Sequence, residues 1–400
     1  MRRLLVLALM TAACRGEAER PQDPGEDAAR FAALVDTLRP AVERAVGLTF
    51  REPPRSAVRT RDQVRSYLEA KLDEELPPER LRGIEAAYRL FGLIDDTVRL
   101  RPLMLDLLTE QVVGYYEPDS AMLFGVAGAP PEQLRIMAAH EMVHALQGQY
   151  LPLDSILDQR GMNDRTTAAQ GILEGQAMFA SIGAVTGSDA LSDPAVWAMF
   201  REQARASQGT MPRFAAAPLI VREALLFPYI EGAEFMRWWA ASPHADTVPY
   251  GPRMPVSTEQ ILHPERYAAG DMPLAVELPP TTDPVLSEDA LGELETRILG
   301  AVHNRLAEVS YTVPLGWAGD RYRVTETPGG PALEWIIVFD DERSRERFEA
   351  TIGARLRRIE RPGYTPLLEQ LSVAGTRPAF RLLLGPAAWT TAMALPMGRS

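Results

Sequence analysis

Cysteine and lysine are almost absent from this 400-residue sequence, which contains only Cys14 and Lys71 of these two types. With a single thiol, the chain forms no internal disulfide bond. Positive charge is also in short supply, because 42 basic residues against 54 acidic residues give a formal net charge of −12. Binding to nucleic acid calls for a basic face, so we expect no nucleic-acid partner.

Long hydrophobic runs are missing as well. No apolar run in the sequence reaches the roughly 20 residues that a transmembrane helix requires. Hydrophobic residues nevertheless make up 46% of the chain, which is typical of a globular protein with a substantial core. A chain of this length is long enough for two domains, or for one large domain and one small one.

Residues 1–14, MRRLLVLALMTAAC, have a basic start, a short apolar run and small residues that end at Cys14. They resemble a bacterial lipoprotein signal, in which cleavage before the cysteine leaves that cysteine to be lipidated. The alternative is a plain secretory peptide, because Thr11 stands where the lipoprotein signal usually has leucine. The polar segment 15–27 is typical of a flexible tether. We therefore expect a membrane anchor on Cys14 and a location in the bacterial cell envelope, facing the periplasm or the exterior.

Helical periodicity begins after this tether. Apolar residues three and four positions apart predict helices over 28–48 and 62–94. Residues 111–126 then predict two short strands joined by a turn at Pro118–Ser120. The next segment, 129–150, returns to helical spacing, with Pro131 tolerated in its first turn.

The segment AAHEMVHALQGQ on this last helix carries His140, Glu141 and His144. Residues four apart lie on one helix face with Cβ atoms about 6 Å apart, so both imidazoles can bind one zinc ion at about 2.0–2.1 Å. Glu141 lies about 100° around the helix, where a general base can take a proton from zinc-bound water. The alternative is a pair of histidines on a partly buried structural helix.

A catalytic zinc ion needs a third protein ligand and an open fourth position. No histidine occurs between His144 and His244, so a further histidine shortly after the motif is excluded. Glu174 lies in a predicted helix over 166–185, among small and apolar residues. A buried carboxylate without a basic neighbour is costly unless something binds it, which favours Glu174 as the third ligand over its alternative, an exposed helix glutamate.

These motifs resemble the gluzincins, the thermolysin-like zinc metallopeptidase superfamily, and more closely a group of bacterial gluzincin-like proteins. The resemblance covers the chain from about residue 110 onward. It is carried by GYYEP from Gly114, HEMVHALQ from His140, LEGQA around Glu174, STEQILHPERY over 257–267 and GWAGDRY over 316–322.

The resemblance implies an α+β fold and a zinc peptidase activity. It implies a mostly helical metallopeptidase domain with a small edge β-sheet over 28–275, with Zn²⁺ held by His140, His144 and Glu174. Gluzincins stabilise the tetrahedral oxyanion with a Tyr or His from a later helix. By this resemblance Tyr229 is the first candidate for that role.

His263 and Tyr267 are two further candidates for stabilising the oxyanion. Zinc-bound histidines usually donate their other N–H to a carboxylate or carbonyl. Many gluzincins have an acidic residue four positions past the third ligand, but Met178 stands there in this chain. Either another group, such as Asp164 or a backbone carbonyl, takes this role, or the metal site is weaker than the motif indicates.

The remainder of the chain predicts a Pro- and Thr-rich linker over 276–287 and a small α+β domain over 288–400. In that domain we expect a helix, a strand pair around a Pro-Gly-Gly turn, a charged helix over 342–359 and a final strand over 379–385. Asp320 and Arg321 are interpreted as a turn salt bridge rather than a site.

The favoured function is a membrane-tethered zinc metallopeptidase that acts on peptide or protein substrates. The strand around GYYEP is either an edge along which substrate pairs or a simple core hairpin. The alternative function is a non-catalytic envelope lipoprotein that keeps the metallopeptidase fold for binding or scaffolding. The presence of Glu141 favours the enzyme, because a scaffold needs ligands but no general base.

Overall fold

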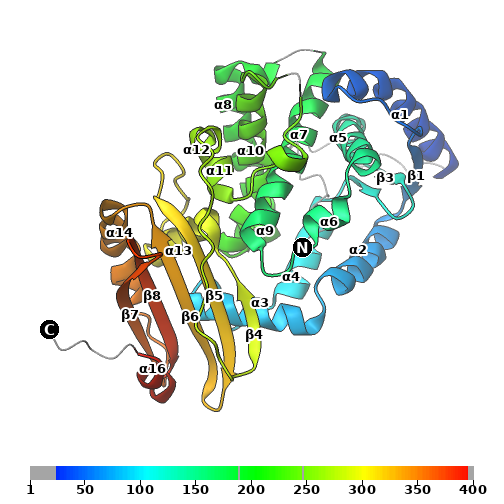
Figure 1. Cartoon of the computed structure of the whole chain (residues 1–400). Coiled ribbons are helices and arrows are strands. Elements are labelled where there is room, and N and C mark those ends of the chain that lie inside the picture. Colours follow the sequence, from blue (N-terminus) through cyan, green and yellow to red (C-terminus); the bar gives the residue numbers. More distant parts are fainter. Residues whose placement is uncertain (1–23, 188–189, 246, 395–400) are drawn as a thin grey trace.

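The computed structural model describes residues 24–187, 190–245 and 247–394. Over these ranges the chain has the α+β fold that the sequence predicts. A mostly helical part with a three-stranded sheet is followed by a five-stranded antiparallel sheet with its own helices (Figure 1). Cys14 and the predicted signal lie outside the described residues. No helix within them is long and apolar enough to cross a membrane.

Four helices form the first part of the chain, and local sequence signals set their ends. Thr60 and Gln63 form a reciprocal capping box at the start of the second helix, which satisfies two otherwise unpaired backbone donors. The third helix ends at Gly92 with φ of 73°, a left-handed conformation that glycine adopts without steric cost. The four helices are α1 (Pro24–Val46), α2 (Arg61–Glu75), α3 (Pro78–Phe91) and α4 (Leu100–Gln111).

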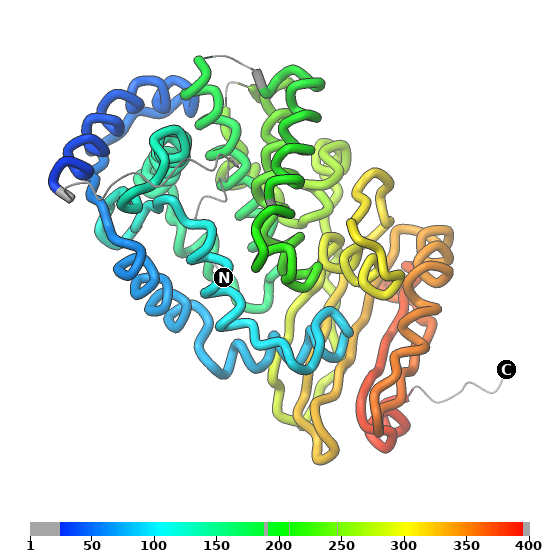
Figure 2. The backbone as a smooth tube through the Cα atoms, turned by 180° about the vertical axis from the view of Figure 1, so that it is seen from behind, coloured from blue at the N-terminus to red at the C-terminus, as the bar shows by residue number. Residues whose placement is uncertain are grey.

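The small sheet has the strand order β1-β3-β2. The two predicted strands are present as β2 (Gly114–Glu117) and β3 (Met122–Val126), which pair antiparallel across the expected turn. The sequence did not predict β1 (Arg55–Arg59), which pairs parallel with β3. Helix α1 packs against β1 and against two later helices, α5 (Pro131–Tyr150) and α7 (Asn163–Thr186) (Figure 2).

Three long helices build the centre of the helical part: α5 (Pro131–Tyr150), α7 (Asn163–Thr186) and α10 (Leu219–Ala240). Helices α7 and α10 touch backbone to backbone. A Cβ atom added at Gly175 would lie 2.2 Å from the carbonyl carbon of Gly232, and one added at Gly232 would lie 2.0 Å from the carbonyl oxygen of Gly171. Only glycine permits this approach, so these positions fix how α7 and α10 lie against each other.

Shorter helices complete the helical part. Of these, α8 packs against α9, and α11 packs against α7. The bounds are α6 (Leu153–Leu157), α8 (Pro194–Gly209), α9 (Pro212–Ala216), α11 (Thr258–Leu262) and α12 (Pro264–Ala268).

The second sheet has the strand order β4-β5-β6-β8-β7, with all neighbours antiparallel. The predicted charged helix over 342–359 is interrupted by a π-helical turn, Glu349–Gly353, that separates α14 from α15. The strands are β4 (Val285–Asp289), β5 (Trp317–Thr327), β6 (Gly330–Phe339), β7 (Tyr364–Val373) and β8 (Arg377–Pro386). The helices are α13 (Gly292–His303), α14 (Glu342–Phe348), α15 (Ala354–Leu356) and α16 (Ala387–Met393).

The segment predicted as a linker, 276–287, packs against the second sheet and joins it. Val276 and Leu278 pack in an apolar cluster with Ala318 of β5, and β4 begins at Val285, inside the predicted linker. These apolar side chains alternate with polar ones, and burial of one face of such a segment favours an extended chain on the sheet.

Helix α3 joins the two parts through aromatic packing. The ring of Phe91 lies edge-on to Tyr322 at 5.5 Å and to Trp335 at 5.3 Å between ring centroids. The largest apolar cluster extends from α2 through α10 and into β6 and β8. The helical part and the second sheet therefore share one core, and the two parts lie against each other in both views (Figures 1 and 2).

Asp320 is a buried hydrogen-bond acceptor at the centre of this second sheet. Its carboxylate accepts from the backbone N–H groups of Leu291 and Gly292, at 2.8 and 2.9 Å. It also accepts from the indole N–H groups of Trp317 and Trp335, at 3.0 and 2.8 Å. The predicted salt bridge between Asp320 and its neighbour in the chain is therefore wrong, because the carboxylate faces inward and is satisfied by four neutral donors.

Arg321 points the other way and pairs with Glu288 of β4 at 3.1 Å. The two side chains separate because successive residues of a strand point to opposite faces of a sheet. Arg321 also donates to the carbonyl oxygen of Gly161, which ties the second sheet to the start of α7.

Candidate metal centre

Helix α5 is buried on every side over 137–147. Its start at Pro131 and the acidic Glu132 in its first turn follow the usual pattern of helix N-termini. A helix that is covered all round lies in the interior of a protein. His140 and Glu141 are 0% exposed, so their polar atoms need partners within the protein or a bound group.

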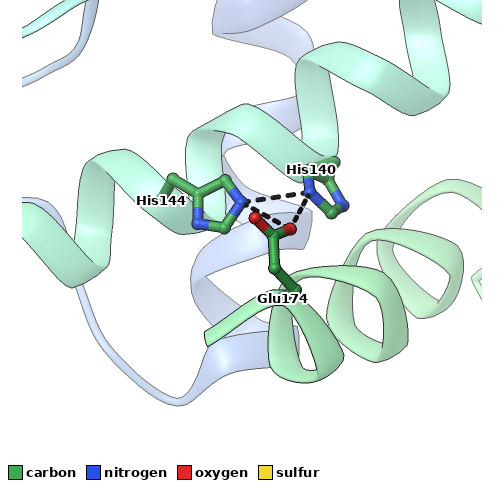
Figure 3. Close-up of side chains that lie close together, drawn as sticks. All are labelled: His140, His144 and Glu174. Atoms are coloured by element: carbon green, nitrogen blue, oxygen red, sulfur yellow. Dashed lines mark hydrogen bonds and ion pairs between the residues drawn. The ribbon is translucent and has the colours of Figure 1, made fainter. Parts of the chain in front are cut away.

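Three ligand atoms converge between α5 and α7 (Figure 3). The Nε2 atoms of His140 and His144 lie 3.0 Å apart. Glu174 Oε2 lies 3.1 Å from the first and 3.2 Å from the second. Adjacent ligands of a tetrahedral zinc ion at 2.0–2.1 Å are separated by about 3.3 Å. The three atoms thus form a triangle of the size that one metal ion requires.

The tautomer of His144 follows from the position of Gln147. The Gln147 amide nitrogen donates to the carbonyl oxygen of Leu173 and to Gln176 Oε1, both at 2.9 Å. A carbonyl oxygen only accepts, so Gln147 Oε1 is the atom that lies 2.8 Å from His144 Nδ1. Nδ1 therefore carries the hydrogen, and in the neutral imidazole Nε2 presents a lone pair.

This lone pair points at two other potential acceptors, His140 Nε2 and Glu174 Oε2. An ionised carboxylate has no hydrogen to donate. Lone pairs that face one another in a buried space repel unless a hydrogen or a cation lies among them. A hydrogen on His140 Nε2, an added proton on an imidazole or a metal cation each meets that need.

The pKa values in the cluster reflect the pairing of its carboxylate with a positive charge. Burial lowers the pKa of His144, but the nearby Glu174 carboxylate outweighs burial and the pKa is raised to about 9. Burial also acts to raise the pKa of Glu174, but the charge of His144 and hydrogen bonds from both histidines hold it below its ordinary value. For His140, burial and the nearby His144 lower the pKa. The cluster thus favours an ionised carboxylate next to a positive charge.

Two buried atoms of the cluster have no hydrogen-bond partner among the described residues: His140 Nδ1 and Glu174 Oε1. Buried polar atoms are nearly always paired, so each exception calls for an explanation. A carboxylate that binds a metal ion through one or both oxygens explains the second. The donor set of two imidazoles and one carboxylate fits a divalent metal ion, and these three residues can hold one.

Glu141 lies next to the cluster, fixed by the small sheet. The backbone N–H of Tyr116 in β2 donates to Glu141 Oε2 at 2.8 Å. Strand β2 is at the sheet edge, but this N–H points to α5, and Gly114, Tyr115 and Tyr116 are buried. Helix α5 thus occupies the free edge of β2, where the sequence allowed a substrate strand to pair. The GYYEP segment is therefore a core hairpin, the other of the two interpretations.

Tyr229 of α10 also lies beside the cluster. Its ring is 6.0 Å from that of His140 between centroids, with an angle of 27° between the ring planes. The contact of α7 with α10 at Gly175 and Gly232 places Tyr229 relative to Glu174. Of the three candidates for oxyanion stabilisation, this one lies against the metal ligands.

The other two candidates have partners elsewhere. His263 Nε2 lies 3.0 Å from Glu293 of α13, and the hydroxyl of Tyr267 donates to the carbonyl oxygen of Arg253. Asp164, expected to support a zinc-bound histidine, instead accepts from the backbone N–H and the hydroxyl of Thr258. That expectation is wrong, because Asp164 lies at the start of α7, more than two turns from Glu174.

The residue that supports His144 is Gln147, which the sequence reasoning missed. It is linked through Gln176 to the hydroxyl of Tyr250, which donates to Gln176 Oε1. The available signal was the spacing, since Gln147 follows His144 by three residues on the same helix face. Met178, at the position where gluzincins usually have an acid, is buried in the apolar core.

Neither a protein-family model nor a curated protein sequence matches this chain. One similar solved structure is that of a candidate hydrolase with a novel fold from Chloroflexus aurantiacus. It is 17% identical, with a TM-score of 0.40, and the match covers 64% of this chain and 92% of that chain. A likeness of this size carries no functional conclusion, and the chemistry of the chain rests on the buried group of His140, His144 and Glu174, which can hold a metal ion.

Proposed function

We propose that this protein is a zinc-dependent peptidase. His140, His144 and Glu174 hold the zinc ion, and Glu141 is the general base. The observation that supports the proposal is the geometry of the cluster. Its three ligand atoms lie within 3.2 Å of one another, and Glu141, a buried carboxylate, directly follows the ligand His140 in the sequence. A structural zinc site normally has four protein ligands, whereas a catalytic site has three and an open position.

The donor set favours zinc over other common ions. Calcium and magnesium prefer sites built from oxygen atoms alone, whereas two imidazoles with one carboxylate suit zinc. The support of His144 by Gln147 Oε1 is of the kind that orients metal-bound histidines. His140 and His144 both offer Nε2, as a shared ion between them requires.

When bound, zinc lowers the pKa of a coordinated water toward about 7 and polarises a carbonyl oxygen. The role of Glu141 is to accept a proton at its carboxylate and to return it to the leaving amine. The Tyr116 N–H holds one oxygen of that carboxylate in place. Tyr229, stacked on His140, would donate a hydrogen bond where negative charge develops on the substrate oxygen.

Location and partners follow from the sequence alone and are part of the proposal. Lipid attachment at Cys14 would tether the folded part to a membrane of the bacterial envelope, with the residues between Cys14 and the start of α1 at Pro24 as the link. The substrates would then be peptides or proteins of the periplasm or exterior. Labelling with a radioactive fatty acid, lost in a Cys14→Ser variant, would test the anchor.

The activity is tested by comparing wild type with Glu141→Gln. We expect both to retain about one zinc per chain by elemental analysis, because the substitution leaves the ligands intact. Cleavage of a denatured protein mixture should fall by about 10²–10⁴-fold, the usual contribution of a general base. A His144→Ala variant, which lacks a ligand, should lose both zinc and cleavage.

A second function is favoured by one specific observation, the depth of the cluster. His140, Glu141, His144 and Glu174 are each at most 1% exposed, which suits a metal site that stabilises a binding module. If wild type and Glu141→Gln both hold zinc and both leave the protein mixture uncut, this scaffolding function replaces the peptidase.

A further inference from the structure

A cavity of about 690 Å³ lies between the helical part and the second sheet. Its walls come from α3, α7, α10 and β4, so four segments far apart in the sequence meet around it. Ligand-binding cavities typically have volumes of about 300–1,000 Å³. The cavity is thus large enough for several residues of a peptide.

The lining combines apolar walls with an excess of acidic groups. Eight carboxylate side chains line the cavity, against three arginines, and two of the eight, Glu74 and Glu288, pair with basic residues outside the lining. Of the arginines, Arg82 and Arg160 are exposed, and Arg82 already pairs with Glu326 outside the cavity. The apolar surface comes mainly from Leu76, Ile84 and Met104 on one side and from Val221 and Leu225 on the other.

Glu295 of α13 is the most deeply buried of these carboxylates, with 6% of its surface exposed. It accepts hydrogen bonds from the hydroxyl of Tyr88 at 2.8 Å and from the Asn163 amide at 3.0 Å. Within the described part of the chain it has no basic partner, and the charges that act on it most strongly are the carboxylates of Asp289 and Asp320. A buried carboxylate without a cation is costly, so a positive group in the cavity would be stabilised.

The pKa of Glu295 is that of a buried carboxyl without a cationic partner. Burial raises this pKa to about 8, although the hydrogen bonds from Tyr88 and Asn163 act to lower it. The carboxylates of Asp289 and Asp320 raise it further. A cation bound next to Glu295 would reverse the shift, since an opposite charge within about 4–6 Å favours the ionised form.

Thr166 supplies an independent sign of a polar ligand. It lines the cavity and is 4% exposed, and its hydroxyl has no hydrogen-bond partner among the described residues. Gln170, also in the lining, follows Thr166 by one turn of α7. Both side chains offer hydrogen bonds to a ligand that lies along this helix.

The cavity lies along the same helix faces as the metal centre. Thr166, Gln170 and Glu174 follow one another at intervals of four residues and so share one face of α7. The same spacing joins Leu225 in the cavity wall to Tyr229 on α10. Gln170 and Thr166 are about 6 and 12 Å from Glu174 along the helix axis, a span of about two to four residues of extended peptide.

We propose that this cavity binds a lysine or arginine side chain of the substrate, with the cationic group at Glu295 and the aliphatic stem along the apolar walls. Placing that residue two to four positions from the cleaved bond rests on the peptidase proposed above. A long aliphatic chain with a charged end matches a cavity whose walls are apolar and whose inner group is acidic. Anionic ligands are disfavoured by the same carboxylates.

Binding is measured in a protein that does not cleave, the zinc-loaded full chain with Glu141→Gln. The probes are two fluorescein-labelled peptides, Ala-Ala-Arg-Ala-Ala and Ala-Ala-Gln-Ala-Ala, followed by fluorescence anisotropy. We expect the arginine peptide to bind about tenfold more tightly, because a charged pair in a desolvated site outweighs a neutral one. Equal affinities would overturn the proposal.

The role of Glu295 is tested by adding Glu295→Gln, which keeps an acceptor for Tyr88 and Asn163 and removes only the charge. The preference for arginine should disappear. The matched control is Glu346→Gln, which removes the same charge from an exposed position on α14 outside the cavity and should change both affinities by less than about twofold. If Glu346→Gln abolishes the preference as well, general surface attraction explains the binding and the proposal is wrong.

A third variant does not depend on the charge. Ala224→Leu adds volume to the cavity wall on α10 and should weaken the arginine peptide about fivefold or more without changing the unfolding temperature. An unchanged affinity contradicts the assignment of the binding site. Hydrolysis is measured separately in wild type, so a retained, Glu295-dependent preference without any cleavage would refute the peptidase and still support the cavity as a binding site for basic side chains.

Discussion

Asp320 in β5 and Glu174 in α7 are both buried carboxylates, but their surroundings are opposite. Asp320 accepts hydrogen bonds from four N–H groups of neutral donors. Glu174 faces the Nε2 atoms of two histidines, and its other oxygen has no partner among the described residues. Burial alone therefore does not distinguish a structural carboxylate from one that binds a ligand. The identity of the neighbouring atoms does.

This difference assigns separate tasks to the two regions. In the second sheet, satisfied polar groups bring the start of α13 and two tryptophans together, so the carboxylate stabilises the fold. Between α5 and α7, three potential metal ligands face one another, and a cation among them would stabilise the arrangement. Substitutions in the two regions should therefore change different measured quantities, stability in the first and metal binding in the second.

The largest expected effect is that of Asp320→Ala on stability. It leaves four buried donors without their acceptor, at about 1–3 kcal/mol for each unsatisfied group, so we expect the free energy of unfolding in urea to fall by about 4 kcal/mol or more. The zinc content of the folded protein should not change. Loss of zinc without loss of stability would show that the two regions do not have separate tasks.

The next effect is the pH dependence of the zinc-free protein. The folded pKa of His144 is raised from 6.5 to about 9, so its contribution to stability is complete below about pH 6.5 and is lost as the pH rises through 9. A shift of this size corresponds to about 3 kcal/mol. Chemical denaturation in EDTA at several pH values measures it.

Two comparisons separate His144 from other groups. Asp164, Glu295 and Glu259, with pKa values raised to about 7, 8 and 9, also lower the stability as the pH rises. A His144→Asn variant should retain their part of the fall and lack only the part that comes from His144. Added zinc should stabilise wild type more at pH 9 than at pH 6.5, since the metal competes with the proton. A stability that rises with pH in EDTA would contradict the positive charge on His144.

A smaller effect is expected for the residue that supports His144. Gln147→Ala should weaken zinc binding by about 10–100-fold, the usual cost of losing a group that orients a metal ligand. Competition with a chromophoric chelator measures this. The control is Gln149→Ala on the same helix, whose side chain bonds to Arg51 and Glu52 instead, and it should leave zinc affinity unchanged.

The smallest effect on stability is expected for Arg321, the residue that follows Asp320 in the chain. Arg321 pairs with Glu288 at the surface, and its guanidinium is partly exposed to solvent. Such pairs contribute about 0–1 kcal/mol, so Arg321→Gln should lower the free energy of unfolding by at most about that amount. If its cost approached that of Asp320→Ala, the adjacent residues would have similar rather than opposite roles.

The sequence predicted the elements whose apolar residues carry a clear period. The helix over 129–150 and the hairpin over 111–126 are present close to their expected bounds. The three missed strands, β1, β4 and β7, all lie at sheet edges. Edge strands have one unpaired side and carry more polar residues, so their hydrophobic alternation is weak. Strands β1 and β4 depend on pairing with β3 and β5 farther along the chain, whereas β7 pairs with β8, the next strand, across a short turn.

All three cluster residues were identified from the sequence. His140 and His144 are four positions apart and so share a helix face, and Glu174 lies in a segment of small and apolar residues. Their support was not identified from the sequence. The orientation of Gln147 depends on the carbonyl oxygen of Leu173, 26 residues away. Asp320 depends on donors from α13, β5 and β6. Roles that are defined by several partners from separate segments cannot be read from local patterns.

The contact of α7 with α10 limits how this protein can change. A single methyl group at Gly175 has no space against Gly232, so alanine there would force the two helices apart and shift Glu174 relative to both imidazoles. Two residues without functional side chains, Gly175 and Gly232, therefore constrain the position of Glu174 relative to the two histidines. Engineering that seeks a roomier site should leave these glycines intact and alter the α10 side chains that face the cavity.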